Sequence, residues 1–133
     1  MRFYDRSVRL YERLAADLNF NVMFSQRGHL TLAHSDSALR TMRWRAEVNK
    51  LQGVRSSVLG PGEIGTLVPH LDVSDRPRFP ILGGLWHPPG GIVRHDAVVW
   101  GYARGADAAG VHLHQDTEVT GIDVAGGRVR GVR

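Results

Sequence analysis

The sequence predicts an α+β or α/β fold, with helices packed on a mixed sheet and a β-hairpin at the C-terminal end. Three observations support this prediction. Apolar residues recur at helical spacing in residues 2–19, and apolar and polar residues alternate in residues 28–33. Two strand-like runs near the end of the chain are separated by the pair Gly126-Gly127. The 133 residues suffice for one core of modest size.

The first predicted element is a helix over residues 2–19. Its apolar positions share one face because they follow the 3.6-residue helical period. These positions are Phe3, Leu10, Leu14 and Leu18. The opposite side carries a stripe of arginines at positions 2, 6, 9 and 13. We interpret this stripe as a solvated face, with a subunit interface as the alternative.

The middle of the chain predicts alternating strands and helices. We expect short strands at residues 21–24 and 28–33, and then a helix that begins after Ser35 or Asp36 and reaches about Gln52. Gly53 is suited to end this helix, because glycine adopts the left-handed conformation found just after helix ends.

Prolines and glycines delimit the next elements. The segment GPGEIGTLVPHL predicts a helix of one or two turns between Pro61 and Pro69. We expect a strand at residues 81–86, which the surrounding prolines would confine to a sheet edge or to the start of a strand. A helix over residues 95–109 follows, closed by Gly110. We then expect a strand at residues 111–114.

The last predicted element is the β-hairpin. Its strands are expected at residues 119–124 and 128–132, joined through Gly126-Gly127. A hairpin alone is marginally stable, so residue 133 is a poor place for a complete domain to end. We therefore expect the chain to be an internal piece of a longer protein.

Composition narrows the class of protein. Apolar residues make up 42% of the chain, which is too many for a disordered segment. No run of about 18 apolar residues occurs, and the N-terminal stretch lacks the apolar centre of a signal peptide. The absence of cysteine excludes disulfide chemistry and suits a reducing compartment. We expect a cytoplasmic protein without membrane association.

Two motifs suggest ligand sites but have simpler interpretations. His112 and His114 would share one strand face like a pair of metal ligands, yet no third ligand lies at a diagnostic spacing. We interpret them as exposed strand residues. The glycines of GPGEIG resemble a phosphate loop, but no convincing strand precedes them and Pro61 interrupts them. We interpret this segment as a proline-capped turn.

The junction HPPGGIVRHD carries the most chemically capable cluster of the chain. His95 follows a Pro-Gly turn, opens a helix and is flanked by Arg94 and Asp96. Arg94 would place a positive charge beside the imidazole and disfavour its protonation. A neutral imidazole nitrogen is what covalent chemistry requires. The residues alone favour a structural role for His95 over a chemical one.

Four segments carry a resemblance to a known family. They are FSQRGHLTLAH, VNKLQGV, HPPGGIVRHDAVVWGYARGAD and GVHLHQDTEVTGI. Together they resemble the beta subunits of heterotetrameric sarcosine oxidases, which belong to the FAD-dependent amine oxidoreductases related to D-amino-acid oxidase and glycine oxidase. The resemblance extends in order over essentially all of the chain.

This resemblance implies a function and two flavin cofactors. In that family noncovalent FAD oxidises sarcosine to glycine, and FMN passes the electrons to oxygen, which gives hydrogen peroxide. The family histidine that carries FMN through its 8α position corresponds to His95, and the basic residue before it to Arg94. Val119 matches a position whose backbone contacts the FAD adenine. The implied partners are the other subunits and a small amine substrate, with no nucleic acid or membrane.

The chain also departs from the family pattern. The N-terminal Rossmann unit, in which a GxGxxG loop joins a strand to a helix, is missing from these residues. We therefore expect an internal fragment that is inactive alone. Residues 1–86 would form part of the substrate domain, and residues 87–133 would return to the FAD-binding domain.

Two alternative functions remain. The first is a fragment of a related single-flavin amine or glycine oxidase, in which His95 would carry no FMN. The second is a non-catalytic basic binding module, suggested by 17 basic against 13 acidic residues. The arginines are scattered, however, and no basic patch with interleaved aromatic residues occurs.

Overall fold

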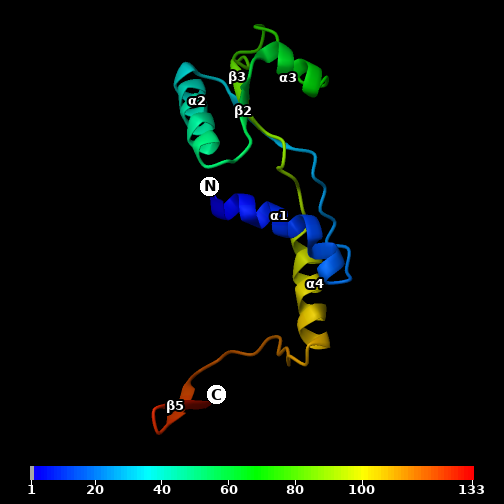
Figure 1. Ribbon diagram of the computed structural model, residues 1–133, viewed down its shortest axis with the longest axis vertical. Helices are drawn as coiled ribbons and strands as arrows, with labels where there is room; N and C mark the ends of the chain where they lie inside the picture. Colours follow the sequence, from blue (N-terminus) through cyan, green and yellow to red (C-terminus); the bar gives the residue numbers. More distant parts are fainter. Residues whose placement is uncertain (1) are drawn as a thin grey trace.

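The computed structural model describes residues 2–133, with side chains described from residue 3 onward. Within residues 2–133, four helices and five short strands follow one another, and they alternate up to the final pair β4 and β5 (Figure 1). The helices are α1 (Arg2–Asp17), α2 (Asp36–Leu51), α3 (Pro61–Leu67) and α4 (His95–Ala108). The strands are β1 (His29–Ala33), β2 (Ser57–Leu59), β3 (Gly83–His87), β4 (Ile122–Ala125) and β5 (Arg128–Val132). The predicted combination of helices with a small sheet and a terminal hairpin is confirmed.

The main sheet has the strand order β1-β3-β2, so β3 is its central strand. Both of its pairings are antiparallel, as is the β4–β5 pairing, so the prediction of a mixed sheet is wrong for residues 2–133. Of the two places expected for the prolines around β3, a sheet edge or the start of a strand, the edge is wrong. Pro80 and Pro88 lie outside β3, and its own residues therefore keep every N–H group that the two ladders need.

Helix α2 covers the sheet and supplies half of the core cluster. Its start is capped as predicted, because the Ser35 hydroxyl accepts a hydrogen bond from the Ala38 N–H at 3.3 Å. Gly53 follows the helix with φ +73°, the left-handed conformation that favours glycine. The core cluster consists of Ala33, Met42, Ala46 and Leu85.

Helices α1 and α4 pack through the segment that follows α1. Asn19 turns the chain with φ +46°, and the Phe20 N–H donates to the Ala15 carbonyl at 3.0 Å. Gly101 of α4 lies against Leu18 and Phe20. Figure 1 shows α1 running past α4 on one side of the molecule. Only part of the predicted apolar face of α1 is covered, because Leu14 is buried whereas Phe3 is 76% exposed.

Two predicted strands do not form. Residues 21–24 are irregular, and the chain makes only a single bridge just beyond them, between Ser25 and Ile92. Residues 111–114 are extended but have no partner strand among residues 2–133. A strand requires a neighbour for its backbone hydrogen bonds, which local alternation does not supply. Conversely, β2 pairs with β3 although its three residues carry no recognisable strand pattern.

The C-terminal hairpin lies apart from the rest of the molecule, at the end of an extended segment (Figure 1). Gly126 and Gly127 form its turn with φ +59° and +72°. The first strand begins at Ile122, later than the predicted Val119, although the Thr120 N–H still donates to the Arg133 carbonyl at 2.7 Å. None of the described helices is both long and apolar enough to cross a bilayer.

Candidate functional site

The turn that leads into α4 is fixed by backbone hydrogen bonds to residues 25–28. Ser25 and Ile92 exchange two hydrogen bonds, with N···O distances of 2.8 and 3.0 Å. The Gly28 N–H donates to the Gly90 carbonyl at 2.8 Å. Three hydrogen bonds therefore hold the turn in place directly before the predicted site.

Two glycines make this close approach possible. A β-carbon on Gly90 would lie 2.6 Å from the His29 β-carbon, and one on Gly91 would lie 2.7 Å from the Ser25 carbonyl oxygen. Both distances are shorter than any normal contact, so the two backbones approach this closely only because both residues lack a side chain. Gly90 and Gly91 thus have a packing role in this turn.

A glutamine side chain adds a further connection to the turn. The Gln26 Nε2 donates to the Glu12 Oε1 of α1 at 2.7 Å and to the Pro89 carbonyl at 2.8 Å. The sequence does not predict these two contacts. No local pattern identifies them, because the two contacts join residues 14 and 63 positions apart.

His95 is the first residue of α4, and its side chain is exposed. Arg94 and Asp96 bracket it and form an ion pair with each other. The Arg94 Nε donates to the Asp96 Oδ1 at 3.1 Å, and its Nη2 donates to the Oδ2 at 2.8 Å. The hydrogen bonds from Arg94 lower the pKa of Asp96, and the bonds to Asp96 raise the pKa of Arg94.

This pairing changes the predicted electrostatics of the site. The sequence suggests that Arg94 acts on His95 as a fixed positive charge beside the imidazole. In the structure the charge of Arg94 is balanced by Asp96, so His95 experiences the weaker field of a dipole. His95 also lies at the positive end of the α4 macrodipole. The site therefore presents an accessible imidazole whose two neighbours are bonded to each other.

In the structure, Val119 is separated from His95 by the whole of helix α4 and by part of the segment that follows it. It belongs to the extended segment after α4, and its side chain is 58% exposed. Helix α4 has 14 residues, which corresponds to a length of about 21 Å. The described residues thus bring His95, Arg94 and Asp96 together and leave Val119 separate.

The remaining histidines do not form a metal site. His87 places its Nδ1 2.6 Å from the Arg55 carbonyl, and His34 places its Nδ1 2.9 Å from the Phe79 carbonyl. His112 and His114 are exposed, as expected, but not on a strand. Within residues 2–133 no cluster of three or more metal-ligating side chains occurs.

The GPGEIG segment is preceded by a strand, so the expectation that no strand comes before it is wrong. Strand β2 ends at Leu59 and α3 begins at Pro61, so the glycines lie between a strand and a helix. The β2–β3 pairing is antiparallel, however, whereas a dinucleotide-binding unit has parallel strands. The Gly60 N–H is also occupied, because it donates to the Glu63 Oε2 at 2.8 Å. The interpretation as a proline-capped turn is confirmed by this helix start.

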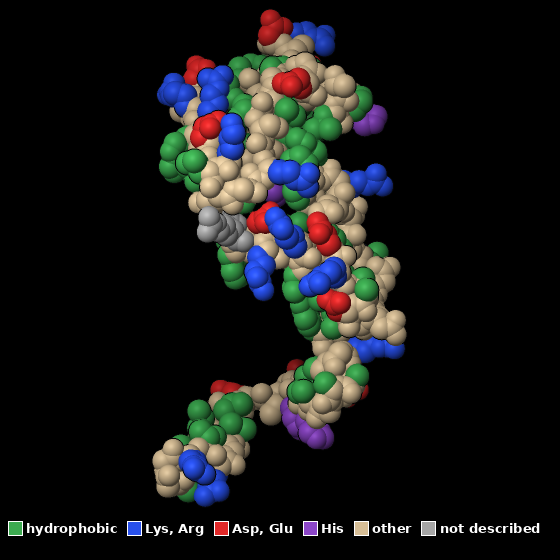
Figure 2. Space-filling view, in the orientation of Figure 1, with side chains coloured by type: hydrophobic (Ala, Val, Ile, Leu, Met, Phe, Trp, Pro, Cys, Tyr) green, Lys and Arg blue, Asp and Glu red, His purple; other side chains and the backbone are tan. Residues whose placement is uncertain are grey.

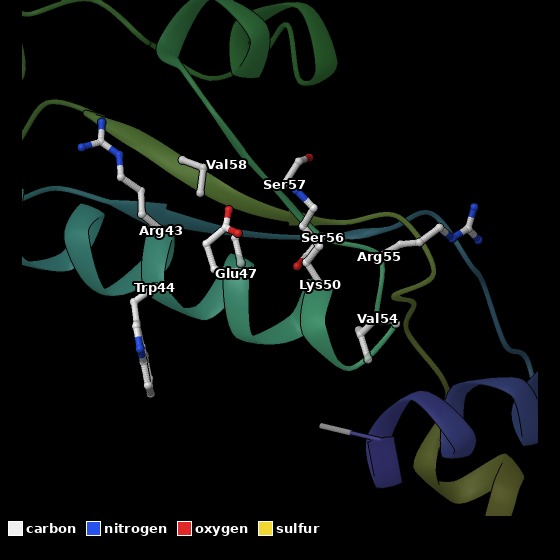
Figure 3. Close-up of a pocket in the computed structure, with 11 residues that line it drawn as sticks. Arg43, Trp44, Glu47, Lys50, Val54, Arg55, Ser56, Ser57 and Val58 are labelled. Atoms are coloured by element: carbon white, nitrogen blue, oxygen red, sulfur yellow. The ribbon is translucent and has the colours of Figure 1, made fainter.

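An open groove of about 850 Å³ lies between α2 and β2, away from α4 (Figure 3). Arg43, Glu47 and Lys50 of α2 face it, whereas Trp44 extends from the side of α2 turned away from the sheet. None of the predicted site residues lines this groove. On the face seen in Figure 2, basic and acidic side chains are interspersed, so this view shows no continuous basic surface.

Comparisons with known proteins place the chain among flavoenzymes. A family model described as FAD dependent oxidoreductase matches residues 1–133. Sarcosine oxidase subunit beta of Rhizobium meliloti is 50% identical over 130 residues, which are 98% of this chain and 31% of that protein. The subunit beta of Rhodobacter capsulatus is 48% identical over 129 residues, which are 97% of this chain and 31% of that protein. The chain thus spans about 31% of the length of these curated relatives.

The fold is also found in a solved structure. L-proline dehydrogenase from P. horikoshii superposes with a TM-score of 0.81 and 27% sequence identity. The match covers 96% of this chain and 32% of that one. The arrangement of helices and antiparallel strands in residues 2–133 is thus one that a larger enzyme contains.

Proposed function

The chain belongs to the family of FAD-dependent oxidoreductases, and on that premise we propose that it is the FMN-bearing segment of a sarcosine oxidase beta-type subunit. The observation that carries the proposal is the 50% identity to sarcosine oxidase subunit beta of Rhizobium meliloti over nearly the whole chain. The proposed reaction is the oxidative demethylation of sarcosine to glycine. Oxygen is the final acceptor and is reduced to hydrogen peroxide.

His95 is the proposed attachment point of FMN. Its imidazole fits this role because it is exposed, and because the carboxylate beside it is already bonded to Arg94. Attachment replaces one imidazole N–H bond and one C–H bond of the 8α methyl group by a C–N bond. The two protons and two electrons released reduce dioxygen to hydrogen peroxide, so the attachment is balanced without another oxidant.

Arg94 and Asp96 have a supporting role in this proposal. Both oxygens of the Asp96 carboxylate already accept hydrogen bonds from Arg94. A hydrogen bond from the His95 imidazole to this carboxylate would therefore be weakened. The His95 nitrogen therefore remains available for bond formation. The positive end of the α4 macrodipole favours an anionic group nearby.

The backbone of Val119 is the proposed contact of the FAD adenine. It lies in an exposed, extended segment, which leaves its peptide groups accessible to a ligand. When bound, FAD and FMN supply the redox chemistry, and the protein holds and orients them. We assign residues 1–86 to the substrate domain and residues 87–133 to the return into the FAD-binding domain.

The proposed assembly is a hetero-oligomer with the other sarcosine oxidase subunits. The relatives are themselves named as subunits, which supports this assignment. We place the enzyme in the cytoplasm, consistent with a sequence that contains no cysteine. The substrate is a small N-methyl amine.

The test is loss of covalent flavin on substitution of His95. In the full-length subunit, expressed with its partner subunits, His95→Ala should abolish the flavin fluorescence that survives acid precipitation. The matched control is His112→Ala, which removes an exposed histidine beyond α4 and should leave that fluorescence unchanged. Full acid-stable fluorescence in His95→Ala would refute the proposal. An enzyme that releases FAD alone on acid treatment would instead support the single-flavin alternative.

A further inference from the structure

We propose that Gln26 is a positioning residue for His95, acting through the carbonyl of Pro89. The inference rests on the proposed function, because it concerns how the attachment residue is held. Gln26 lies in the segment of residues 18–28 and connects this segment both to helix α1 at Glu12, which directly precedes the segment, and to the turn before α4 at Pro89, 63 positions away. It is the side chain at which these three parts meet.

The orientation of the Gln26 amide is determined by its two partners. Both hydrogen bonds originate at Nε2, and each partner is an oxygen that only accepts: the Glu12 carboxylate and the Pro89 carbonyl. Reversing the amide would place its oxygen against both acceptors and replace two attractions by two repulsions. The NH2 group is thus used completely, with one hydrogen for each acceptor.

The constraint on Pro89 reaches His95 over a short stretch of backbone. Gly90 and Ile92 are bonded to Gly28 and Ser25, respectively, on either side of Gln26. After Ile92 only two residues, Val93 and Arg94, precede the first residue of α4. A shift of the turn would therefore be passed on to the position and direction of the His95 side chain.

The same segment also holds the helix that carries His95. Gly101 of α4 lies against Leu18 and Phe20, and Gly105 lies against Leu18. The segment of residues 18–28 therefore contacts α4 at Gly101 and Gly105 and binds the turn before the helix. The bond from Gln26 to Glu12 connects this segment to α1, next to the packed rings of Tyr11 and Phe24, whose centroids are 5.8 Å apart.

A set of three variants isolates the Pro89 contact. Gln26→Glu preserves the shape of the side chain but removes both donors and brings a carboxylate close to Glu12. Glu12→Gln is the matched control, because its amide oxygen still accepts from Gln26. The double variant Glu12→Gln/Gln26→Glu exchanges donor and acceptor and restores the contact with α1, while the Pro89 carbonyl remains without its donor.

The first measurement needs no flavin and uses the 133-residue chain. Hydrogen exchange of the Ile92 amide should be about fivefold faster in Gln26→Glu and in the double variant, since each loses the bond to Pro89. The rate should remain close to that of the unaltered chain in Glu12→Gln. An unchanged rate in Gln26→Glu, or full restoration in the double variant, would overturn the inference.

The second measurement follows covalent flavin in the full-length subunit with its partners. At saturating FMN, attachment should be about fivefold slower in Gln26→Glu and in the double variant, and normal in Glu12→Gln. Saturation ensures that the rate reports the placement of His95 and not weaker binding of FMN. If FMN attached at the normal rate in Gln26→Glu but not at all in His95→Ala, the positioning role of Gln26 would be overturned and the proposed function would stand. Persistence of covalent flavin in His95→Ala would refute the proposed function, and hydrogen exchange would still decide the role of Gln26.

Discussion

Arg94 forms an ion pair with Asp96 across His95, through two parallel hydrogen bonds of 3.1 and 2.8 Å. This fork-to-carboxylate geometry is the strongest arrangement available to an exposed ion pair. Arg94 precedes the first helical residue, and Asp96 lies in the first turn, where a negative charge is favourable. The pair therefore joins the end of the turn to the start of α4 around the proposed attachment residue.

The Asp96 carboxyl group should titrate at a lower pH than an ordinary aspartate. Hydrogen bonds from Arg94 are the largest cause of its lowered pKa, followed by the Ala97 backbone N–H. Because the folded-state pKa lies below the unfolded value of about 4, the pair stabilises the fold above that pH. Its contribution is lost as the pH falls through the folded-state pKa. Titration of the Asp96 carboxyl carbon by NMR measures this directly.

Removal of the arginine should reverse that shift. In Arg94→Gln the titration midpoint of Asp96 should rise toward the ordinary range, because the main hydrogen-bond donor and its charge are gone. Arg104→Gln, a change near the other end of α4, serves as the control and should leave the midpoint in place. Equal midpoints in Arg94→Gln and the unaltered chain would show that the pair does not form in solution.

Addition of a methyl group at Gly91 should destabilise the fold. A β-carbon there would lie 2.7 Å from the Ser25 carbonyl oxygen, so the turn and residues 24–28 must separate. Gly91→Ala should lower the free energy of unfolding by about 1–3 kcal/mol, the usual cost of overpacking. Urea denaturation of the 133-residue chain provides the measurement.

The control for this substitution is Gly62→Ala in α3. No atom outside its own helix and immediate neighbours lies within 4 Å of the added β-carbon, and alanine favours a helix by up to about 1 kcal/mol over glycine. The control should therefore be neutral or slightly stabilising. If the two variants had equal stability, the close approach at Gly91 would be disproved.

The 133-residue chain by itself should not retain FAD. Its one GxGxxG-like segment lies beside an antiparallel strand, and the Gly60 N–H at the start of α3 is already bonded to Glu63. The family unit that binds the pyrophosphate of FAD requires a parallel βαβ arrangement with free N–H groups. Gel filtration of the chain with added FAD should yield colourless protein. A stoichiometric, reducible FAD bound to the chain would contradict this expectation.

Local patterns predicted the helices well. Ser35 and Gly53 delimited α2, Pro61 marked the start of α3, and the glycine pair located the hairpin turn. Each of these signals acts within a few residues, through capping or through backbone conformation. Because these signals can be read from a few neighbouring residues, the helix bounds in the structure differ only slightly from the predicted bounds.

Local patterns in the sequence did not predict the contacts between residues that are far apart in the chain. The alternation in residues 111–114 suggested a strand, but no partner is present in the described part of the chain. The pairing of Ser25 with Ile92 and the bridge through Gln26 depend on how the chain returns on itself. The sequence likewise suggested that Arg94 acts on His95, whereas the structure shows Arg94 engaged with Asp96.

The most direct test of the account is the mass of one tryptic peptide. Cleavage after Arg94 and Arg104 releases the residues from His95 to Arg104 as a single fragment. In the full-length subunit, purified with its partners, this peptide should carry the added mass of one FMN less two hydrogen atoms, located on His95 by fragmentation. An unmodified peptide from an active, flavin-loaded enzyme would contradict the assignment of His95 as the attachment residue.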